Sequence, residues 1–356
     1  MARRKPTIES AREAIDKLNE QLLDLLNQRT ALVDQVRELK VRQGLELYDP
    51  VREAQQIQRL VQKNRGPMSS TMVEAVFQEI FRSSLSHQLH TATDQAPLVL
   101  SRSGQPRTVD VRSVPVGRGR PVIIAGPCAV ESEEYLDQVA ETLARLGLRF
   151  LRGGAFKPRT SPYAFQGLGM PGVEMLARVA ARHDLRVVSE VTDACTLPEL
   201  VRHVDLVQVG SRSMYNYDLL RRLGTAGRPV LLKRHFSATM DELFQAAEYL
   251  LSAGNRDVIL CERGIRTFER ATRNTLDISA VCLVKEHTDL PVIVDVSHAA
   301  GRRDLLLPLS RAALAAGADG IMVEVHPNPA AAMSDGSQQL SLPDFERYLE
   351  GIASFL

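Results

Sequence analysis

Two glycines and three cations share the eight residues 152–159, directly after the short apolar run Phe150–Leu151. Glycine lets the backbone approach a ligand closely, and cations gathered beyond the end of a strand attract anions. This stretch therefore predicts a binding site for phosphate or carboxylate groups. An ordinary exposed basic loop is the alternative, and the other strand ends decide between the two interpretations.

Polar residues stand at or just after the ends of eight apolar runs. They are Cys128, Arg152, Glu190, Gln208, Lys233, Glu262 with Arg263, Asp295 with His298, and Glu324 with His326. Strands that are covered on both faces make such side chains costly unless they are paired. Any one of them could belong to a satisfied ion pair, but all eight ends together favour one shared polar site.

These residues and their neighbours form two chemical groups. The first group consists of cations, which suit a ligand that carries phosphate and carboxylate groups: Arg152, Lys157, Arg159, Arg212, Lys233 and Arg263. The second group offers a thiolate, an imidazole and two carboxylates: Cys128, His298, Glu324 and Asp335. That donor set can bind a transition metal of intermediate softness. The spacing is long, so the prediction depends on three members standing at strand ends.

The elements that must position these groups repeat one pattern over residues 121–356. The apolar runs are Pro121–Ala125, Phe150–Leu151, Arg186–Val188, Leu206–Val209, Pro229–Leu232, Asp257–Leu260, Pro291–Val294 and Gly320–Val323. Helical patterns lie between them, such as Glu133–Leu146, Val173–His183, Met240–Ala253, Thr272–Glu286 and Asp304–Ala316. Eight strand-then-helix units predict an α/β fold, a closed (β/α)8 TIM barrel with its site at the C-terminal strand ends.

Two details accompany the barrel prediction. An open doubly wound sheet is the alternative, but no Gly-x-Gly-x-x-Gly turn follows the first run. The alternating segment Thr108–Val114 predicts a short strand that caps the barrel.

The N-terminal segment has a different periodicity. Residues 7–42 contain neither proline nor glycine, and their apolar residues recur every three or four positions, which predicts one long amphipathic helix of about 50 Å. Two more helices are predicted, over residues 50–63 and 71–89. A single small all-α domain cannot cover a helix of this length. We therefore expect an interlocked dimer of two chains.

Polar residues interrupt the apolar stripes of these helices. Arg29 and Lys40 fall on or beside the stripe of the first helix, and Ser84 and Gln88 continue that of the third. A cation on an apolar stripe indicates an anionic ligand or partner, because unpaired buried charge is costly. A frayed helix end or an internal ion pair would also explain the pattern.

The composition is that of a soluble globular protein, with 44% hydrophobic and 24% charged residues. A net charge of +1 gives no signal for nucleic acid or a membrane surface, and no apolar run could span a bilayer. Four cysteines among 356 residues do not make a disulfide framework, so we expect a reduced, cytoplasmic protein. The polar stretch 91–120 predicts a helical domain over 1–92, a linker over 93–110 and the barrel over 111–356.

The helical segment resembles the all-helical chorismate mutase domain. The resemblance rests on Ala11–Ile15, Leu22–Arg29, Lys40, Asp49–Glu53 and Ser84–Gln88. It implies an intertwined, three-helix dimer that converts chorismate to prephenate, with Arg12 of the partner chain and Arg29 on the carboxylates. Lys40 and Gln88 would meet the ether oxygen, with Glu53 nearby. The site would be completed by Asp49, Arg52 and Ser84. This rearrangement needs no nucleophile, only a held conformer and stabilised charge.

The barrel segment resembles the 3-deoxy-D-arabino-heptulosonate 7-phosphate (DAHP) synthases of the compact type I beta subgroup, and the whole chain resembles their fusion with chorismate mutase. The motifs are Ile124–Ser132, Leu151–Tyr163, Val209–Arg212, Leu231–Arg234, Glu262–Thr267, Ser297–Ala299 and Val323–Pro327. The resemblance implies that phosphoenolpyruvate is bound by Arg152, Lys157, Arg212, Lys233 and Arg263, with Glu190 near its reacting end. Erythrose 4-phosphate would meet Pro158, Arg159 and Thr160. The metal would be held by Cys128, His298, Glu324 and Asp335.

The resemblance leaves several points open. The ion is expected to be Mn, with Fe, Co or Zn as alternatives, and the barrels could pair the dimers into a tetramer. The helical domain could be a catalytic mutase, or only a sensor through which chorismate or prephenate inhibits the barrel. An octulosonate synthase acting on arabinose 5-phosphate is a further alternative. Three segments depart from the family pattern: Ser213–Tyr215, His235–Phe236 and Val296.

Overall fold

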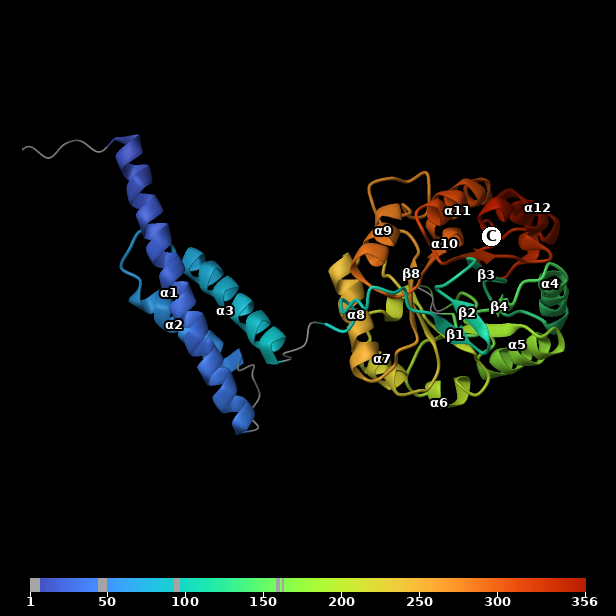
Figure 1. Cartoon of the computed structure of the whole chain (residues 1–356), viewed down its shortest axis with the longest axis horizontal. Coiled ribbons are helices and arrows are strands. Elements are labelled where there is room, and N and C mark those ends of the chain that lie inside the picture. Colours follow the sequence, from blue (N-terminus) through green and yellow to red (C-terminus); the bar gives the residue numbers. More distant parts are fainter. Residues whose placement is uncertain (1–6, 44–49, 93–96, 158–160, 162) are drawn as a thin grey trace, which may run out of the picture. The chain divides into compact units, whose positions relative to one another are not determined.

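The computed structural model describes the whole chain except residues 1–6, 44–49, 93–96, 158–160 and 162. It forms two compact units, Met1–Ala96 and Pro97–Leu356 (Figure 1). The first unit is helical and the second is a barrel, as the sequence predicted. None of the described helices has both the length and the apolar character needed to cross a membrane.

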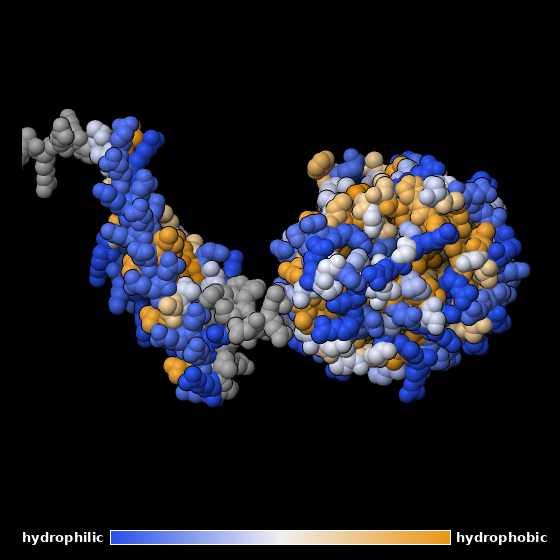
Figure 2. All heavy atoms as spheres, viewed as in Figure 1, coloured by the Kyte–Doolittle hydropathy of each residue, from blue (hydrophilic) through white to orange (hydrophobic). Residues whose placement is uncertain are grey.

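The helical unit contains α1 (Ile8–Arg42), α2 (Pro50–Lys63) and α3 (Ser70–Ala92). Within its described part, the buried apolar side chains are Val73 and Phe81. The stripe on α1 remains largely uncovered, and its leucines at positions 18, 22, 25, 32 and 39 are 53–62% exposed. Figure 2 shows apolar side chains on the surface of this unit. A single chain therefore does not bury the stripe that the sequence predicted.

The second unit is a closed barrel of parallel strands in the order β10-β3-β4-β5-β6-β7-β8-β9. The bounds are β3 (Val122–Gly126), β4 (Phe150–Arg152), β5 (Arg186–Val191), β6 (Leu206–Val209), β7 (Val230–Lys233), β8 (Val258–Glu262), β9 (Val292–Asp295) and β10 (Gly320–Glu324). Each apolar run of the sequence is one of these strands, so the predicted (β/α)8 barrel is confirmed. The cause is the repeated pairing of a short apolar strand with an amphipathic helix.

Helices surround the barrel (Figure 1). They are α4 (Glu133–Arg145), α5 (Met170–Arg182), α6 (Leu197–Leu200), α7 (Tyr217–Gly224), α8 (Met240–Ser252), α9 (Ile278–His287), α10 (Val296–Ala300), α11 (Leu306–Ala315) and α12 (Leu342–Ile352). Their starts follow capping chemistry: the Thr239 hydroxyl and the Glu242 carboxylate form a capping box on α8. Helix α9 begins six residues later than predicted, because Asp277 caps it and Ile265 pairs with Thr275 in the loop before it.

A two-stranded antiparallel hairpin closes the N-terminal end of the barrel. It consists of β1 (Val109–Val111) and β2 (Val114–Val116), where the sequence predicted a single strand. Arg112 and Ser113 turn the chain with φ of 48° and 68°, as a tight hairpin turn requires. Its three buried valines pack on the inward residues of the barrel strands: Ile124, Phe150, Val188, Leu206, Leu231, Ile259, Ile293 and Met322.

The inward-facing side chains change from apolar to polar two positions beyond this apolar layer on each strand. Side chains alternate along a strand, so residues two positions apart point the same way. Two positions after the apolar layer stand Gly126, Arg152, Glu190, Gln208, Lys233, Cys261, Asp295 and Glu324. The period of the strands therefore carries most of the polar residues singled out in the sequence to one end of the barrel.

Candidate active site

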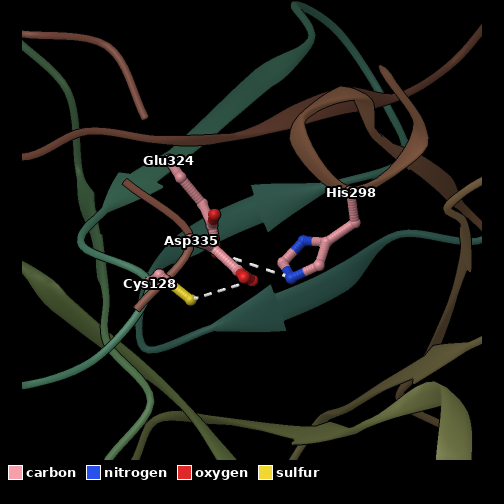
Figure 3. Close-up of side chains that lie close together, drawn as sticks. All are labelled: Cys128, His298, Glu324 and Asp335. Carbon is pink, nitrogen blue, oxygen red and sulfur yellow. Dashed lines mark hydrogen bonds and ion pairs between the residues drawn. The ribbon is translucent and has the colours of Figure 1, made fainter. Parts of the chain in front are cut away.

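The four predicted metal ligands meet at this polar end. Cys128 follows β3, His298 lies on α10, Glu324 ends β10 and Asp335 lies in the loop after β10. One ligand atom from each lies within 4.8 Å of the others. Figure 3 shows the four side chains pointing toward one another. The arrangement fits the thiolate, imidazole and carboxylate donors that a transition metal takes.

The backbone brings these four residues together in two ways. Strands β3 and β10 are neighbours, with Glu324 level with Gly126. At Gly126 φ is +148°, and a Cβ there would lie 2.0 Å from the carbonyl oxygen of Arg152. Only glycine therefore fits at this position. Asp335 has a left-handed φ of +49°, a conformation that Asp adopts more readily than most residues.

Cys128 is fully buried, and its surroundings are polar. Its N–H donates to Gln339 Oε1 at 2.9 Å, and Lys157 Nζ lies 3.0 Å from its carbonyl oxygen and 3.1 Å from its sulfur. Burial, together with the charge of Glu324, raises the pKa of the Cys128 thiol to about 11. A bound cation would favour the thiolate, because only the deprotonated form is a metal ligand.

His298 is oriented by a carboxylate. Its Nδ1 lies 2.8 Å from Asp295 Oδ2, while Nε2 lies 3.5 Å from Glu324 Oε1. Burial lowers the pKa of His298, which favours the neutral imidazole that binds metals. Lys233 also pairs with Asp295, so one buried carboxylate positions both a predicted metal ligand and a cation.

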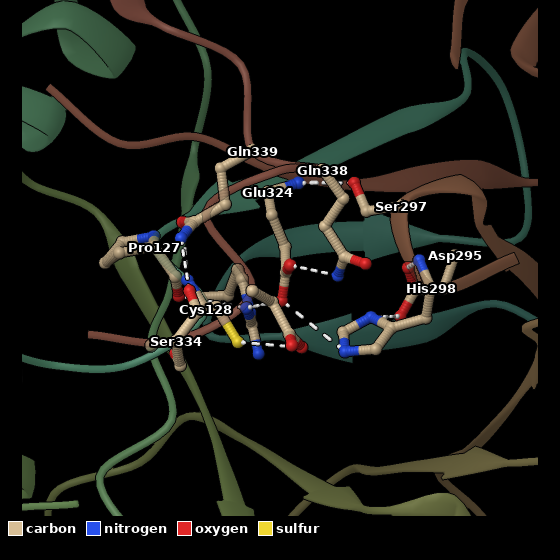
Figure 4. Close-up of polar contacts among 12 residues, drawn as sticks. Pro127, Cys128, Asp295, Ser297, His298, Glu324, Ser334, Gln338 and Gln339 are labelled. Carbon is tan, nitrogen blue, oxygen red and sulfur yellow. Dashed lines mark hydrogen bonds and ion pairs between the residues drawn. The ribbon is translucent and has the colours of Figure 1, made fainter. Parts of the chain in front are cut away.

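The two predicted carboxylate ligands have their own partners. Glu324 accepts from Arg152 at 2.8 Å and from Gln338 at 2.6 Å (Figure 4). Asp335 accepts from Arg273 at 3.1 Å. Although burial opposes it, the pKa of Asp335 is lowered to about 2, mainly by Arg273. Burial also opposes ionisation of Glu324, but the charges of His298 and Arg152 lower its pKa, so both carboxylates are ionised near neutral pH and can hold a cation.

A cleft of about 400 Å³ opens beside this group. Seven cations line it: Arg152, Lys157, Arg212, Lys233, Arg263, Arg266 and Arg273. The carboxylates among its lining residues are Glu190 and Asp335. So strong an excess of positive charge suits a ligand or a pair of ligands with several anionic groups.

Glu190 is held against one wall of the cleft. Gln208 Nε2 donates to its carboxylate at 2.9 Å. A Cβ at Gly210 would lie 2.0 Å from Glu190 Oε1. Glycine at this position therefore leaves room for the carboxylate to reach the cleft.

The helical unit brings together part of its predicted site. Arg29 donates to the Ser84 hydroxyl and lies over the ring of Phe81 at 5.1 Å. Burial lowers the pKa of Arg29, and the charge of Glu53 opposes this change. Arg12 is exposed, and it lies 17 positions before Arg29 on the same helix, a separation of about 25 Å.

Several predicted site residues are not described in full. Asp49, Pro158, Arg159 and Thr160 lie outside the described residues, and for Gln88 only the helical backbone is described. Lys40 and Arg52 are described, and both interact with other groups. The roles assigned to all these residues stay predictions.

Sequence reasoning assigned no role to several residues that the fold brings into the site. They are Asp295, Gln338 and Gln339 beside the metal group, and Arg266, Arg273 and Asn274 in the cleft. Asp295 was noted at a strand end, and its spacing of three from His298 was an available signal. The others lie in loops, whose paths follow from long-range contacts.

Comparison with known proteins gives consistent matches. The model described as "DAHP synthetase I family" matches residues 95–354, and "Chorismate mutase type II" matches residues 11–89. Phospho-2-dehydro-3-deoxyheptonate aldolase of Thermotoga maritima is 51% identical over 254 residues, which are 71% of this chain and 74% of that protein. A crystal structure of the DAHP synthase of Thermotoga maritima superposes on this chain with a TM-score of 0.69 at 48% identity. The match covers 71% of this chain and 74% of that chain. A 2-dehydro-3-deoxyphosphooctonate aldolase of Fusobacterium nucleatum is 33% identical over 253 residues, 66% of this chain and 90% of that protein.

Proposed function

The chain belongs to the DAHP synthetase I family and carries a chorismate mutase type II domain, and from this premise we propose how its residues perform two reactions. The barrel is a DAHP synthase, which joins phosphoenolpyruvate, erythrose 4-phosphate and water to give DAHP and phosphate. The helical unit is the chorismate mutase domain, and we assign it the conversion of chorismate to prephenate. The observation that carries the first assignment is the metal-binding group beside a cleft lined by seven cations.

Phosphoenolpyruvate would lie at the bottom of the cleft. Its carboxylate and phosphate would be bound by Arg152, Lys157, Arg212, Lys233 and Arg263. Arg152 and Lys233 are buried and already fixed by Glu324 and Asp295, so they are pre-organised for a ligand. Pro158, Arg159 and Thr160 would bind erythrose 4-phosphate nearer the opening.

A divalent metal would be held by Cys128, His298, Glu324 and Asp335. When bound, the ion supplies Lewis-acid polarisation of the aldehyde oxygen. Mn is our first expectation, and Fe, Co and Zn suit the same donor set. Metal-replacement assays with both substrates identify the ion that supports turnover.

The protein's own residues then govern the chemistry. C3 of phosphoenolpyruvate attacks the aldehyde carbon to form the new carbon–carbon bond, and Lys157 is positioned to protonate the resulting alkoxide. Positive charge develops at C2, where water adds, and Glu190 would accept the proton that this water loses. Cleavage of the bond between C2 and the phosphate oxygen then releases phosphate, and the C2 hydroxyl gives its proton to the departing phosphate and becomes the ketone of DAHP. Arg212, Lys233 and Arg263 would stabilise the charge of the phosphate.

The mutase site would form between two copies of the helical unit. Arg29 with Ser84 would hold one carboxylate of chorismate, and Arg12 of a second chain would hold the other. Lys40 and Gln88 would stabilise the breaking ether bond, with Asp49, Arg52 and Glu53 completing the site. The exposed stripe on α1 supports the second copy, because an intertwined dimer would cover it. Pairing of the barrels into a tetramer is compatible with this arrangement.

Feedback control is the second part of the proposal. Chorismate or prephenate bound to the helical unit would inhibit the barrel. Deleting residues 1–92 should keep DAHP synthesis and abolish that inhibition. Unchanged sensitivity of the truncated protein would overturn the regulatory role.

Two assays test the synthase assignment. The purified chain should consume phosphoenolpyruvate with erythrose 4-phosphate much faster than with arabinose 5-phosphate, and a preference for the five-carbon sugar would favour the octulosonate alternative. A second assay measures the conversion of chorismate. If the chain does not convert chorismate, the helical unit is only a sensor and dimerisation module.

All four cysteines are free, in keeping with a cytoplasmic location.

A further inference from the structure

Arg266 is held at the cleft by an aromatic ring. Its Cζ atom lies 4.4 Å from the centroid of the Phe236 ring, and its backbone N–H donates to the Phe236 carbonyl at 2.7 Å. Both residues line the cleft. The two contacts fix the loop after β8 to the loop after β7, and they fix the guanidinium through its face, leaving its N–H donors at the edge.

The ring of Phe236 is itself supported by a second pair of residues. The His235 ring packs on it with centroids 4.0 Å apart, and Tyr215 packs on His235 at 5.3 Å. The N–H of His235 donates to the sulfur of Met214 at 3.2 Å. Residues 213–215 lie after β6 and residues 235–236 lie after β7, and the two segments contact each other. They therefore act as one structural unit, which we call the aromatic support: Tyr215, His235 and Phe236.

Three arginines line the cleft together with Phe236: Arg212, Arg263 and Arg266. Burial, together with the charges of these three arginines, lowers the pKa of His235. Among the described residues, neither Arg263 nor Arg266 has a carboxylate or other acceptor paired with its guanidinium. Cations that face one cleft without a paired acceptor form a binding site for an anion.

We propose that Arg266 is a further substrate-binding residue, which donates to a phosphate monoester dianion beside Arg212 and Arg263, and that the aromatic support positions it. The proposal rests on the synthase function above, and both substrates carry such a phosphate. A planar guanidinium whose face is stacked and whose edge is free matches the oxygens of a phosphate better than an ammonium group does.

The test uses the full-length, metal-loaded enzyme and the variant Arg266→Gln. The KM for phosphoenolpyruvate or for erythrose 4-phosphate should rise about ten- to a hundred-fold, the effect of losing one charge-assisted hydrogen bond. The substrate whose KM rises identifies the phosphate that Arg266 binds. Arg270→Gln, an exposed arginine in the same loop, should leave both KM values unchanged. Unchanged KM values in Arg266→Gln would overturn the proposal.

Phe236→Leu tests the aromatic support. It keeps the bulk of an apolar side chain and removes the ring, so the same KM should rise about two- to five-fold with little change in kcat. A role confined to folding would instead lower the melting temperature and leave the KM values as they were, which would contradict the positioning role.

A binding experiment separates this proposal from the catalytic assignment. Inorganic phosphate should raise the melting temperature of the full-length protein, and it should do so less in Arg266→Gln than in Arg270→Gln. This difference is expected even if the enzyme preferred another aldehyde. Equal stabilisation of the two variants would overturn the anion site whatever reaction the barrel performs.

Discussion

The Nδ1 atom of His298 and the Oδ2 atom of Asp295 lie 2.8 Å apart, and the carboxylate is fully buried. Asp295 is therefore the group that fixes the imidazole so that Nε2 faces the other three predicted ligands. Asp295→Asn should weaken metal affinity about 10- to 100-fold, because a metal-bound histidine depends on the acceptor behind it. Metal titration of the dialysed protein measures this. Asp304→Asn, at an exposed surface pair with Arg302, is the control, and equal affinities would contradict the prediction.

Removal of the metal should stop DAHP synthesis. A chelator is expected to abolish it, and added Mn should restore it. Cys128→Ser should lose more metal affinity than the roughly 10- to 100-fold expected for the orienting Asp295, because the sulfur is proposed as a direct ligand. Cys195→Ser and Cys282→Ser, which change the two exposed cysteines, should behave like the unaltered chain. Full metal content in Cys128→Ser, measured by elemental analysis, would remove Cys128 from the ligand set.

The two activities should separate at Arg29. Arg29→Ala removes the cation that donates to Ser84, and it should lower chorismate turnover by about ten- to a hundred-fold, the effect of losing a charge-assisted hydrogen bond to a substrate carboxylate. DAHP synthesis without effector should not change. Arg42→Ala, at the exposed end of the same helix, is the matched control. Normal mutase turnover in Arg29→Ala would refute this site.

The exposed stripe on α1 should be an interface between two copies. Leu18 and Leu25 are 62% and 61% exposed in one chain, so Leu18→Glu with Leu25→Glu costs a single chain little. In a dimer the same changes bury charge, which should dissociate it. Analytical ultracentrifugation should show a smaller species, and chorismate turnover should fall while DAHP synthesis persists. An unchanged sedimentation coefficient would show that the stripe is covered in some other way.

Gly210→Ala should damage the synthase through Glu190. The added methyl would overlap Glu190 Oε1, which lies 2.0 Å from the ideal Cβ position, and the carboxylate must move. We expect a loss of about 1–3 kcal/mol in folding stability and a fall in kcat, read from thermal unfolding and steady-state assays. Gly66→Ala has only Asn64 Oδ1 near it, at 3.6 Å, and should leave both quantities unchanged. A fully active Gly210→Ala would show that Glu190 need not reach the cleft.

The barrel could be predicted because its signals are local. Each strand is a short apolar run followed by a polar residue, and the fixed alternation of a strand sends Arg152, Lys233 and Glu324 the same way. The metal group was predictable for the same reason, since Glu324 ends a strand and Cys128 and His298 closely follow strand ends. Asp335 was placed in the same donor group although it ends no strand, and its left-handed loop gives no periodic signal.

The parts that sequence reasoning missed depend on contacts between distant segments. Arg273 reaches Asp335 across 62 positions and Gln338 across 65, and no spacing rule connects such residues. The late start of α9 has a similar cause, because Ile265 and Thr275 pair and hold an otherwise helical stretch as a loop. The hairpin was read as one strand since its turn uses Arg112 and Ser113 rather than glycine or asparagine.

The hairpin of β1 and β2 closes the N-terminal end of the barrel with buried valines. Val109, Val111 and Val116 are completely buried against the apolar layer of the barrel strands, so the cleft opens at the opposite end. If the two substrates occupy the cleft as proposed above, the one that reaches Arg152 binds first and the one nearer the opening binds second. The hairpin at the closed end would then set the order of binding from the end of the barrel opposite the site.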